Sequence, residues 1–299
     1  MELLSFNELD TERDRFDALV ASTPDIDSFC SSTMWLLPAH EAFGPRHDSV
    51  VHRTAAGYIA LVRAVGADEH GNAMRVVQPL ELSWGFPSPL IGPSPEPLAE
   101  DLAHLLLRFH DWDLVALSGI VPESPTFDAI LERLGRNFRL FRGESTRRYR
   151  SSLEGGLDAF LAKRSRDFRK NARRGFTKAA NTGLTFVQAP MSASADQANA
   201  LYDRLLAVDD SSWKGLAGVG LNASAMTVHY RGITKRLAER GLLRLWFCQH
   251  DGRDVAYILG GLFAKTYRGL QFAYDAAYTE YGLGNLAQLT TIETLGQEG

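Results

Sequence analysis

The stretch 242–289 constrains the fold most, because it has the pattern of three strands followed by a glycine turn and a helix. The predicted strands are 242–249, 255–263 and 268–275, with Leu270, Phe272 and Tyr274 on one face of the third. Asp251 and Gly252 lie between the first two strands and favour a type I′ hairpin turn. Gly282 and Gly284 then indicate a turn, and apolar residues recur at helical spacing over 286–295.

This glycine turn is a candidate phosphate site. A turn at a helix N-terminus presents free backbone N–H groups and the positive end of the helix dipole to a ligand. We predict that Gly282, Gly284 and Asn285 form such a cradle. The alternative is a turn that begins a helix and binds nothing.

Composition predicts an ordinary globular chain of 299 residues, with a net charge of -4 that argues against nucleic-acid binding by bulk electrostatics. The N-terminus lacks the order of a secretory signal, and we predict no transmembrane segment and a cytoplasmic location. Cys30 and Cys248 are too few for a disulfide framework. No metal-ligand spacing is present, so no metal site is predicted.

The order of hairpin strands, third strand, turn and helix occurs around 50–109 and again around 242–295. We therefore predict two tandem α/β halves, 1–144 and 145–299, although chance likeness of common α/β elements is the alternative. Between these stretches, 112–120 and 138–142 have strand character.

A basic amphipathic helix is predicted over 153–181. Its core, 163–174, carries seven cations against one acid, Asp167, which favours an anionic ligand or an acidic partner nearby. Arg suits bidentate contacts with phosphate or carboxylate, so the first candidates are Arg166, Arg169 and Arg173. The alternative is a solvated helix face.

Trp213 and Lys214 are the other candidates for binding an acceptor substrate. They follow a predicted helix and precede glycines, which suits a mobile loop whose indole stacks on a sugar and whose ammonium contacts a carboxylate. A tryptophan buried in the core with an exposed lysine beside it is the alternative.

The order of these motifs resembles the GNAT acyltransferase superfamily, and within it the CelD-like acyltransferases of exopolysaccharide synthesis and the Fem-type aminoacyl transferases. The motifs are the basic segment 163–174, Ser212-Trp213-Lys214-Gly215, the hairpin 251–256, and the segments 274–278 and 281–284. The resemblance implies a GNAT-like mixed, twisted sheet flanked by helices. It also implies a pyrophosphate loop after the third strand, with the donor's pantetheine arm along the strand edge.

The sequence departs from the family pattern in two ways. Thr279 stands where the family's loop has Gln or Arg, which weakens the expectation of coenzyme A. The family also continues past the last helix to a further strand, whereas this chain ends at Leu295-Gly296-Gln297-Glu298-Gly299. We therefore expect either a truncated chain or a donor cleft completed by the first half.

The expected activity is acyl transfer from acetyl-CoA or another acyl-CoA to an amine or hydroxyl of a sugar or cell-envelope precursor. Asp275 is the predicted base and Tyr281 the predicted acid, although a turn-capping aspartate and a packed tyrosine are the alternatives. A binding module that uses the basic helix for RNA or an acidic partner is the second hypothesis. Transfer from aminoacyl-tRNA would combine both features. Neither the acceptor nor the oligomeric state follows from the sequence.

Overall fold

The computed structural model describes residues 1–81, 83–109 and 111–298, and the chain divides into two compact units, Met1–Thr146 and Arg147–Gly299. Gly299, the last residue of the predicted second half, lies outside the described residues. Each unit contains one sheet flanked by helices, so the predicted mixed α/β fold is confirmed.

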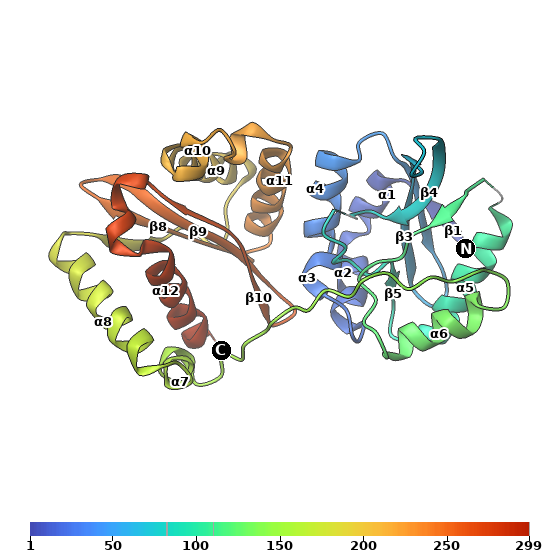
Figure 1. Ribbon diagram of the computed structural model, residues 1–299, viewed down its shortest axis with the longest axis horizontal. Helices are drawn as coiled ribbons and strands as arrows, with labels where there is room; N and C mark the ends of the chain where they lie inside the picture. The colour runs from blue at the N-terminus through green and yellow to red at the C-terminus, as the bar shows by residue number, and fades with distance from the viewer. Residues whose placement is uncertain (82, 110, 299) are drawn as a thin grey trace. The chain divides into compact units, whose positions relative to one another are not determined.

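Unit 1 is built on a sheet in the order β1-β2-β3-β4-β6, with β5 paired to β3 (Figure 1). All pairs are antiparallel except β4 with β6, which are parallel. The strands are β1 (Glu2–Leu4), β2 (Asp48–Arg53), β3 (Tyr58–Ala67), β4 (Ala73–Pro79), β5 (Leu90–Ile91) and β6 (Leu114–Val115). The helices are α1 (Phe6–Thr11), α2 (Arg13–Ser22), α3 (Ser28–Ser31), α4 (Thr33–Phe43), α5 (Pro95–Arg108) and α6 (Pro125–Leu134).

One hydrophobic cluster of unit 1 lies between its sheet and helices α5 and α6. Leu98, Leu102 and Leu105 recur on one side of α5 and pack against Ile59 and Leu61 of β3. Because this face is continuous over the length of the helix, its burial fixes α5 against the sheet.

His40 of α4 makes the stability of unit 1 depend on pH. Its ring stacks on Phe6 with centroids 3.5 Å apart, and burial, followed by the charge of His47, lowers the pKa of His40 to about 4. The folded state therefore disfavours the protonated ring, so this contribution is present above the unfolded pKa of about 6.5 and is lost as pH falls through 4. Urea unfolding at pH 7 and 4.5 should show a larger loss for the wild type than for His40→Gln; equal losses would contradict this assignment.

Unit 2 is built on a sheet in the order β10-β9-β8-β7, with every pair antiparallel. Its strands are β7 (Thr185–Gln188), β8 (Leu243–His250), β9 (Arg253–Phe263) and β10 (Thr266–Tyr274). Its helices are α7 (Gly156–Ala162), α8 (Arg166–Asn181), α9 (Ala195–Ser211), α10 (Trp213–Leu216), η1 (Leu221–Ala223), α11 (Met226–Glu239), η2 (Ala276–Tyr281) and α12 (Leu283–Glu298).

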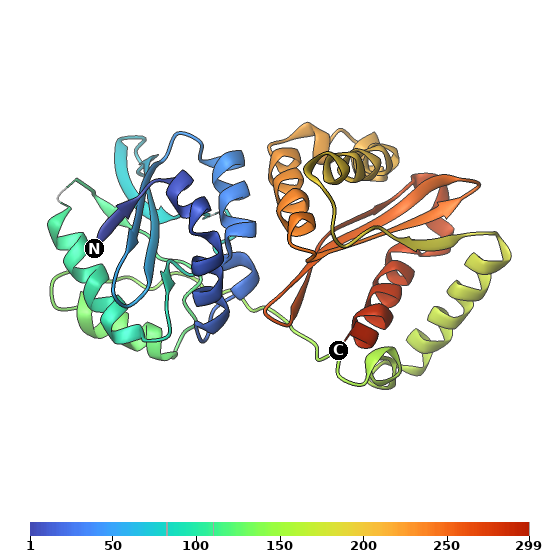
Figure 2. The same ribbon diagram turned by 180° about the vertical axis from the view of Figure 1, so that it is seen from behind.

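The helices of unit 2 form two layers on its sheet. Helices α7, α8 and α12 lie on one face, and α9, α10 and α11 lie on the other, as both views show (Figures 1 and 2). On the first face, Ala179 of α8 and Leu286 of α12 join Val255 and Ala256 in one buried cluster. A Cβ on Gly175 would lie 3.1 Å from Leu286 Cδ2, so α8 and α12 approach closely there.

The two units share one order of elements. In each, a first strand is followed by helices, then by three antiparallel strands and a helix: β1 to α5 in unit 1, where the short β5 comes before α5, and β7 to α12 in unit 2. The first four strands also have the same neighbours in both sheets. In unit 1 a further strand, β6, pairs in parallel with β4.

Several details of the predicted elements are wrong. The strand predicted over 112–120 is reduced to Leu114–Val115, and 138–142 forms no strand because it pairs with no neighbouring strand. The single helix predicted over 153–181 is two helices, since Ser165 accepts the N–H of Phe168 and begins α8 anew. The alternation predicted along β10 is broken by a bulge between Gly269 and Gln271.

Candidate functional site

The turn between β10 and α12 has the geometry of a cradle at a helix N-terminus. Gly282 adopts a left-handed conformation with φ 62°, and a Cβ there would meet no atom within 4 Å. Its carbonyl accepts the N–H groups of Asn285 and Leu286 at 3.0 and 3.3 Å, which starts α12. The N–H of Asn285 is therefore already bonded, so only its exposed side chain could contact a ligand. Open space lies in front of Gly282, where the dipole of a 16-residue helix favours an anion.

Gly284 has a packing role in the structure. A Cβ at this position would lie 2.8 Å from Cε2 of Phe272, so the first turn of α12 packs directly on the Phe272 ring of β10. A contact of Gly284 with phosphate stays a prediction.

The predicted base and acid both lie on the segment that leads to this turn. Asp275 caps η2, its Oδ1 accepting the N–H of Ala277 at 2.9 Å, and its Oδ2 lies 3.7 Å from a guanidinium nitrogen of Arg253. The ring of Tyr281 lies 4.5 Å from the ammonium of Lys178. The capping interaction occupies one oxygen of Asp275, and the roles of base and acid stay predictions.

Lys178 is the cation that the structure places beside the turn, and the sequence prediction missed it. Its Nζ donates to the Glu280 carboxylate at 2.8 Å, and this hydrogen bond lowers the pKa of Glu280. Next to it, His250 Nδ1 and the Tyr278 hydroxyl are 2.8 Å apart, and the rings of Tyr278 and Tyr281 are 5.9 Å apart. A cation in the last turn of a helix was the available signal, but only packing shows that α8 ends against η2.

The basic face of α8 is largely exposed. Arg169 donates to the carbonyls of Arg164 and Ala162 at 3.0 and 3.4 Å, so it caps the end of α7. Arg166 and Arg173 are exposed and make no side-chain hydrogen bond or ion pair with any residue that the structure describes. They are therefore available to an anionic ligand.

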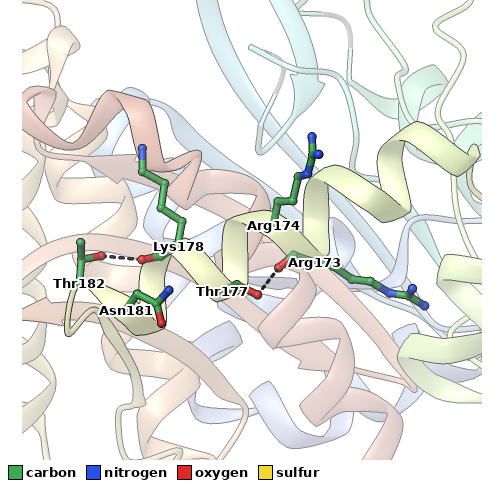
Figure 3. A pocket seen from close by; sticks show the side chains of 6 residues that line it. All are labelled: Arg173, Arg174, Thr177, Lys178, Asn181 and Thr182. Carbon is green, nitrogen blue, oxygen red and sulfur yellow. Dashed lines mark hydrogen bonds between the residues drawn. The ribbon is translucent and has the colours of Figure 1, made fainter.

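The C-terminal half of α8 lines an open hollow of about 470 Å³. In Figure 3, Arg173 and Arg174 extend in different directions from the helix, and Lys178 extends from the next turn. The hydroxyls of Thr177 and Thr182 donate to the carbonyls of Arg173 and Lys178, at 3.0 and 2.8 Å. Asn181 completes the lining. Three cations line the hollow, and Arg173 and Arg174 carry charge beyond the pairing of Lys178 with Glu280, so the hollow favours an anion.

Trp213 and Lys214 lie on the opposite face of the sheet from α8. They begin α10, which packs on α9, whereas α8 packs on α12 (Figure 1). The single acceptor surface predicted from these two groups is therefore not formed within unit 2. Trp213 is 61% exposed, so the alternative of a core tryptophan is wrong, and the predicted loop is a short helix capped by Ser212.

The two cysteines are not placed for catalysis by a thiolate. Both are buried, and burial raises the pKa of the Cys248 thiol to about 12, which leaves it protonated near pH 7. Across the described ranges, His, Cys, Asp and Glu side chains form no group of three or more that could hold a metal ion. Within the same ranges, we find no helix with the length and apolar character needed to cross a bilayer.

Comparison with known proteins finds a similarity over the second part of the chain. Residues 166–299 match the sequence model of the acetyltransferase (GNAT) domain. A crystal structure of FemX superposes with a TM-score of 0.59 at 11% identity, covering 100% of this chain and 87% of that one. A C-terminal DUF2156 domain from Agrobacterium fabrum gives a TM-score of 0.46 at 14% identity, covering 88% and 75%. None of the curated protein sequences matches this chain.

Proposed function

We propose, from the match of residues 166–299 to the acetyltransferase (GNAT) domain model, that the protein transfers an acyl or aminoacyl group to an amine or hydroxyl. The observation that carries this proposal is the turn at Gly282, where an edge strand runs through η2 into the N-terminus of α12. This is the place where the resemblance puts the donor's pyrophosphate. Lys178, on the neighbouring helix, is close enough to contribute positive charge.

The reaction needs little covalent participation by the protein. The acceptor's nitrogen or oxygen attacks the donor carbonyl, a base removes the acceptor's proton, and the leaving thiolate or ribose oxygen takes up a proton as its bond to carbon breaks. We assign Asp275 as the base and Tyr281 as the acid, since they lie at the start and the end of η2, the segment that leads into the turn. Strand β10 lies at the edge of its sheet within the described residues, so its outward N–H groups could stabilise the oxyanion.

The resemblance leaves two classes of donor. Acyl-CoA suits the turn at Gly282, and a sugar or cell-envelope precursor would then be the acceptor. Aminoacyl-tRNA, the donor of Fem-type transferases, suits the exposed cations of α8, which would contact RNA phosphates. Unit 1 shares the strand order of unit 2, and we propose that it is a diverged GNAT-like half.

The donor is tested by two variants that separate the turn from the basic helix. A Phe at Gly282 would project into the open space before α12, at a backbone cost of about 1–2 kcal/mol for a left-handed residue. If acyl-CoA is the donor, titration calorimetry should show acetyl-CoA binding to the wild type and not to Gly282→Phe. Gly282→Asn is the matched control, because Asn tolerates the same φ without filling the space.

If aminoacyl-tRNA is the donor, binding should instead depend on the cations of α8. Removing two of the exposed cations of α8 in Arg166→Ala/Arg173→Ala should weaken tRNA binding by about tenfold or more and lower the slope of log affinity against log salt by about 2. Arg169 is left in place because it caps α7. If the intact, folded chain binds neither acetyl-CoA nor charged tRNA, the proposed transferase activity is wrong.

A further inference from the structure

Unit 2 exposes three large apolar side chains on one turn. Trp213, Leu216 and Val219 are 61%, 72% and 64% exposed, and all belong to the segment 212–221, here called the 212–221 turn. Apolar groups of this size usually pack against the protein, because each exposed one loses the free energy of burial. The clustering of three such side chains within seven residues therefore indicates an interaction surface.

The backbone of this turn is held rigidly, so its apolar groups cannot fold inward. Ser212 Oγ accepts the N–H of Gly215 at 3.3 Å, and a Cβ on Gly215 would lie 2.4 Å from the carbonyls of Asp209 and Asp210. The buried carboxylate of Asp209 accepts the N–H of Leu221 at 2.7 Å, which ties the end of the turn to its beginning. The exposed side chains are thus presented in a fixed arrangement.

Half of the N–H groups of the turn are bonded within the turn itself. Five consecutive ones, from Gly215 to Val219, donate to acceptors within the turn itself. The acceptors are Ser212 Oγ and the carbonyls of Ser212, Trp213, Gly215 and Lys214. Exposed turns usually leave such groups to water, whereas a segment that enters lipid must bond them internally. Internal pairing beneath an apolar tip therefore suits a low-dielectric environment.

The size of the surface favours lipid over a protein partner. Fully covered, the three side chains supply on the order of 400 Å², about half of what one partner contributes to a standard protein interface. A bilayer surrounds an exposed side chain without needing a complementary groove. Trp213 suits this place because its indole favours the boundary between lipid and water.

The charge of the turn is nearly balanced. Lys214 contributes one cation within the turn. Asp210, just before it in α9, contributes one acid, and both of its carboxylate oxygens accept from the Asn222 amide at 2.9 Å. Arg204 and Arg231 on the adjoining helices are paired with Asp254 and Asp203 at 2.8 Å. Binding through this surface should therefore depend on apolar burial and little on salt.

We propose that the 212–221 turn docks unit 2 on the interface of a phospholipid bilayer, with Trp213, Leu216 and Val219 entering the boundary between headgroups and acyl chains. This inference does not depend on the proposed transfer reaction, because the turn lies on the sheet face opposite to α12.

The test is co-flotation of the full chain with uncharged phosphatidylcholine vesicles at 0.1 and 0.5 M salt. Neutral vesicles exclude attraction by the cations of α8. The wild type should float at both salt concentrations, and Leu216→Ser/Val219→Ser should bind at least about tenfold less. Val65→Ser is the matched control, since Val65 of β3 is 77% exposed and lies outside the turn, and it should bind like the wild type.

Three results would overturn the proposal. They are no flotation of the folded wild type, equal flotation of the double variant, and flotation that disappears at 0.5 M salt. Light scattering measures self-association. If the wild type self-associates and the double variant does not, the turn binds a second copy of the chain, and the lipid proposal is wrong. Circular dichroism of both variants verifies folding, which the exposed positions should preserve.

Discussion

Asp209→Ala should lower the free energy of local unfolding around α9 and the 212–221 turn by about 4 kcal/mol. The side chain of Asp209 is fully buried and accepts the N–H of Leu221 at 2.7 Å and the Tyr257 hydroxyl at 3.1 Å. Burial, together with the Asp209 charge, raises the pKa of Tyr257, so the phenol stays protonated and acts as the donor. Alanine leaves both buried donors without an acceptor, and each costs about 1–3 kcal/mol.

The control for this prediction is Asp209→Asn. The amide oxygen can accept from Leu221, and its NH₂ can donate to the oxygen of Tyr257, so both bonds persist in altered form. Removing a desolvated charge also offsets part of any loss. Hydrogen exchange of amides in α9, η1 and β9 should therefore be much faster in Asp209→Ala and little changed in Asp209→Asn. Similar protection in the alanine variant would show that the carboxylate does not hold the turn.

The hairpin and the glycine turn were predictable because their signals are local. Asp251 and Gly252 have φ values of 49° and 76°, as a type I′ turn requires, and β8 and β9 end and begin beside them. Gly282 is left-handed at the predicted junction of η2 and α12. Each of these features is decided by a few adjacent residues, so a single sequence contains the information.

What depends on long-range packing was not predictable. The bulge in β10 depends on the register against β9, and the strand predicted at 138–142 fails because no strand edge pairs with it. The pairing of Lys178 with Glu280 joins residues 102 positions apart. In the same way, Trp213 and the basic helix lie on opposite faces because the sheet comes between α10 and α8, and no periodicity within either segment encodes that separation.

The structure therefore defines the cations of the candidate site more closely at the glycine turn than the sequence did. The cations singled out from composition, Arg166 and Arg173, lie along α8, whereas the one that contacts the glycine turn's own segment is Lys178. A donor phosphate at Gly282 would compete with Glu280 for this ammonium. The site therefore has a cation already positioned by a carboxylate that a stronger anion could displace.

Gly57→Ala should lower the free energy of unfolding of unit 1 by more than about 4 kcal/mol. Gly57 has φ 148°, and a Cβ there would lie 2.0 Å from the carbonyl oxygen of Ile91. That oxygen belongs to β5, which pairs with β3 through Tyr58 and Ile59. Because the contact is with backbone, relief requires β5 to separate from β3, and this exposes Ile59 and Leu90 of the core.

Gly71→Ala provides the matched comparison for Gly57→Ala. Gly71 also has a positive φ, 81°, but a Cβ there would meet nothing within 4 Å, so its substitution adds backbone strain of about 1–2 kcal/mol without a collision. Hydrogen exchange of β3 and β5 amides should be strongly accelerated in Gly57→Ala and much less accelerated in Gly71→Ala. If both variants lose protection equally, conformational strain alone governs these glycines, and the close approach of Gly57 to β5 does not hold the sheet together.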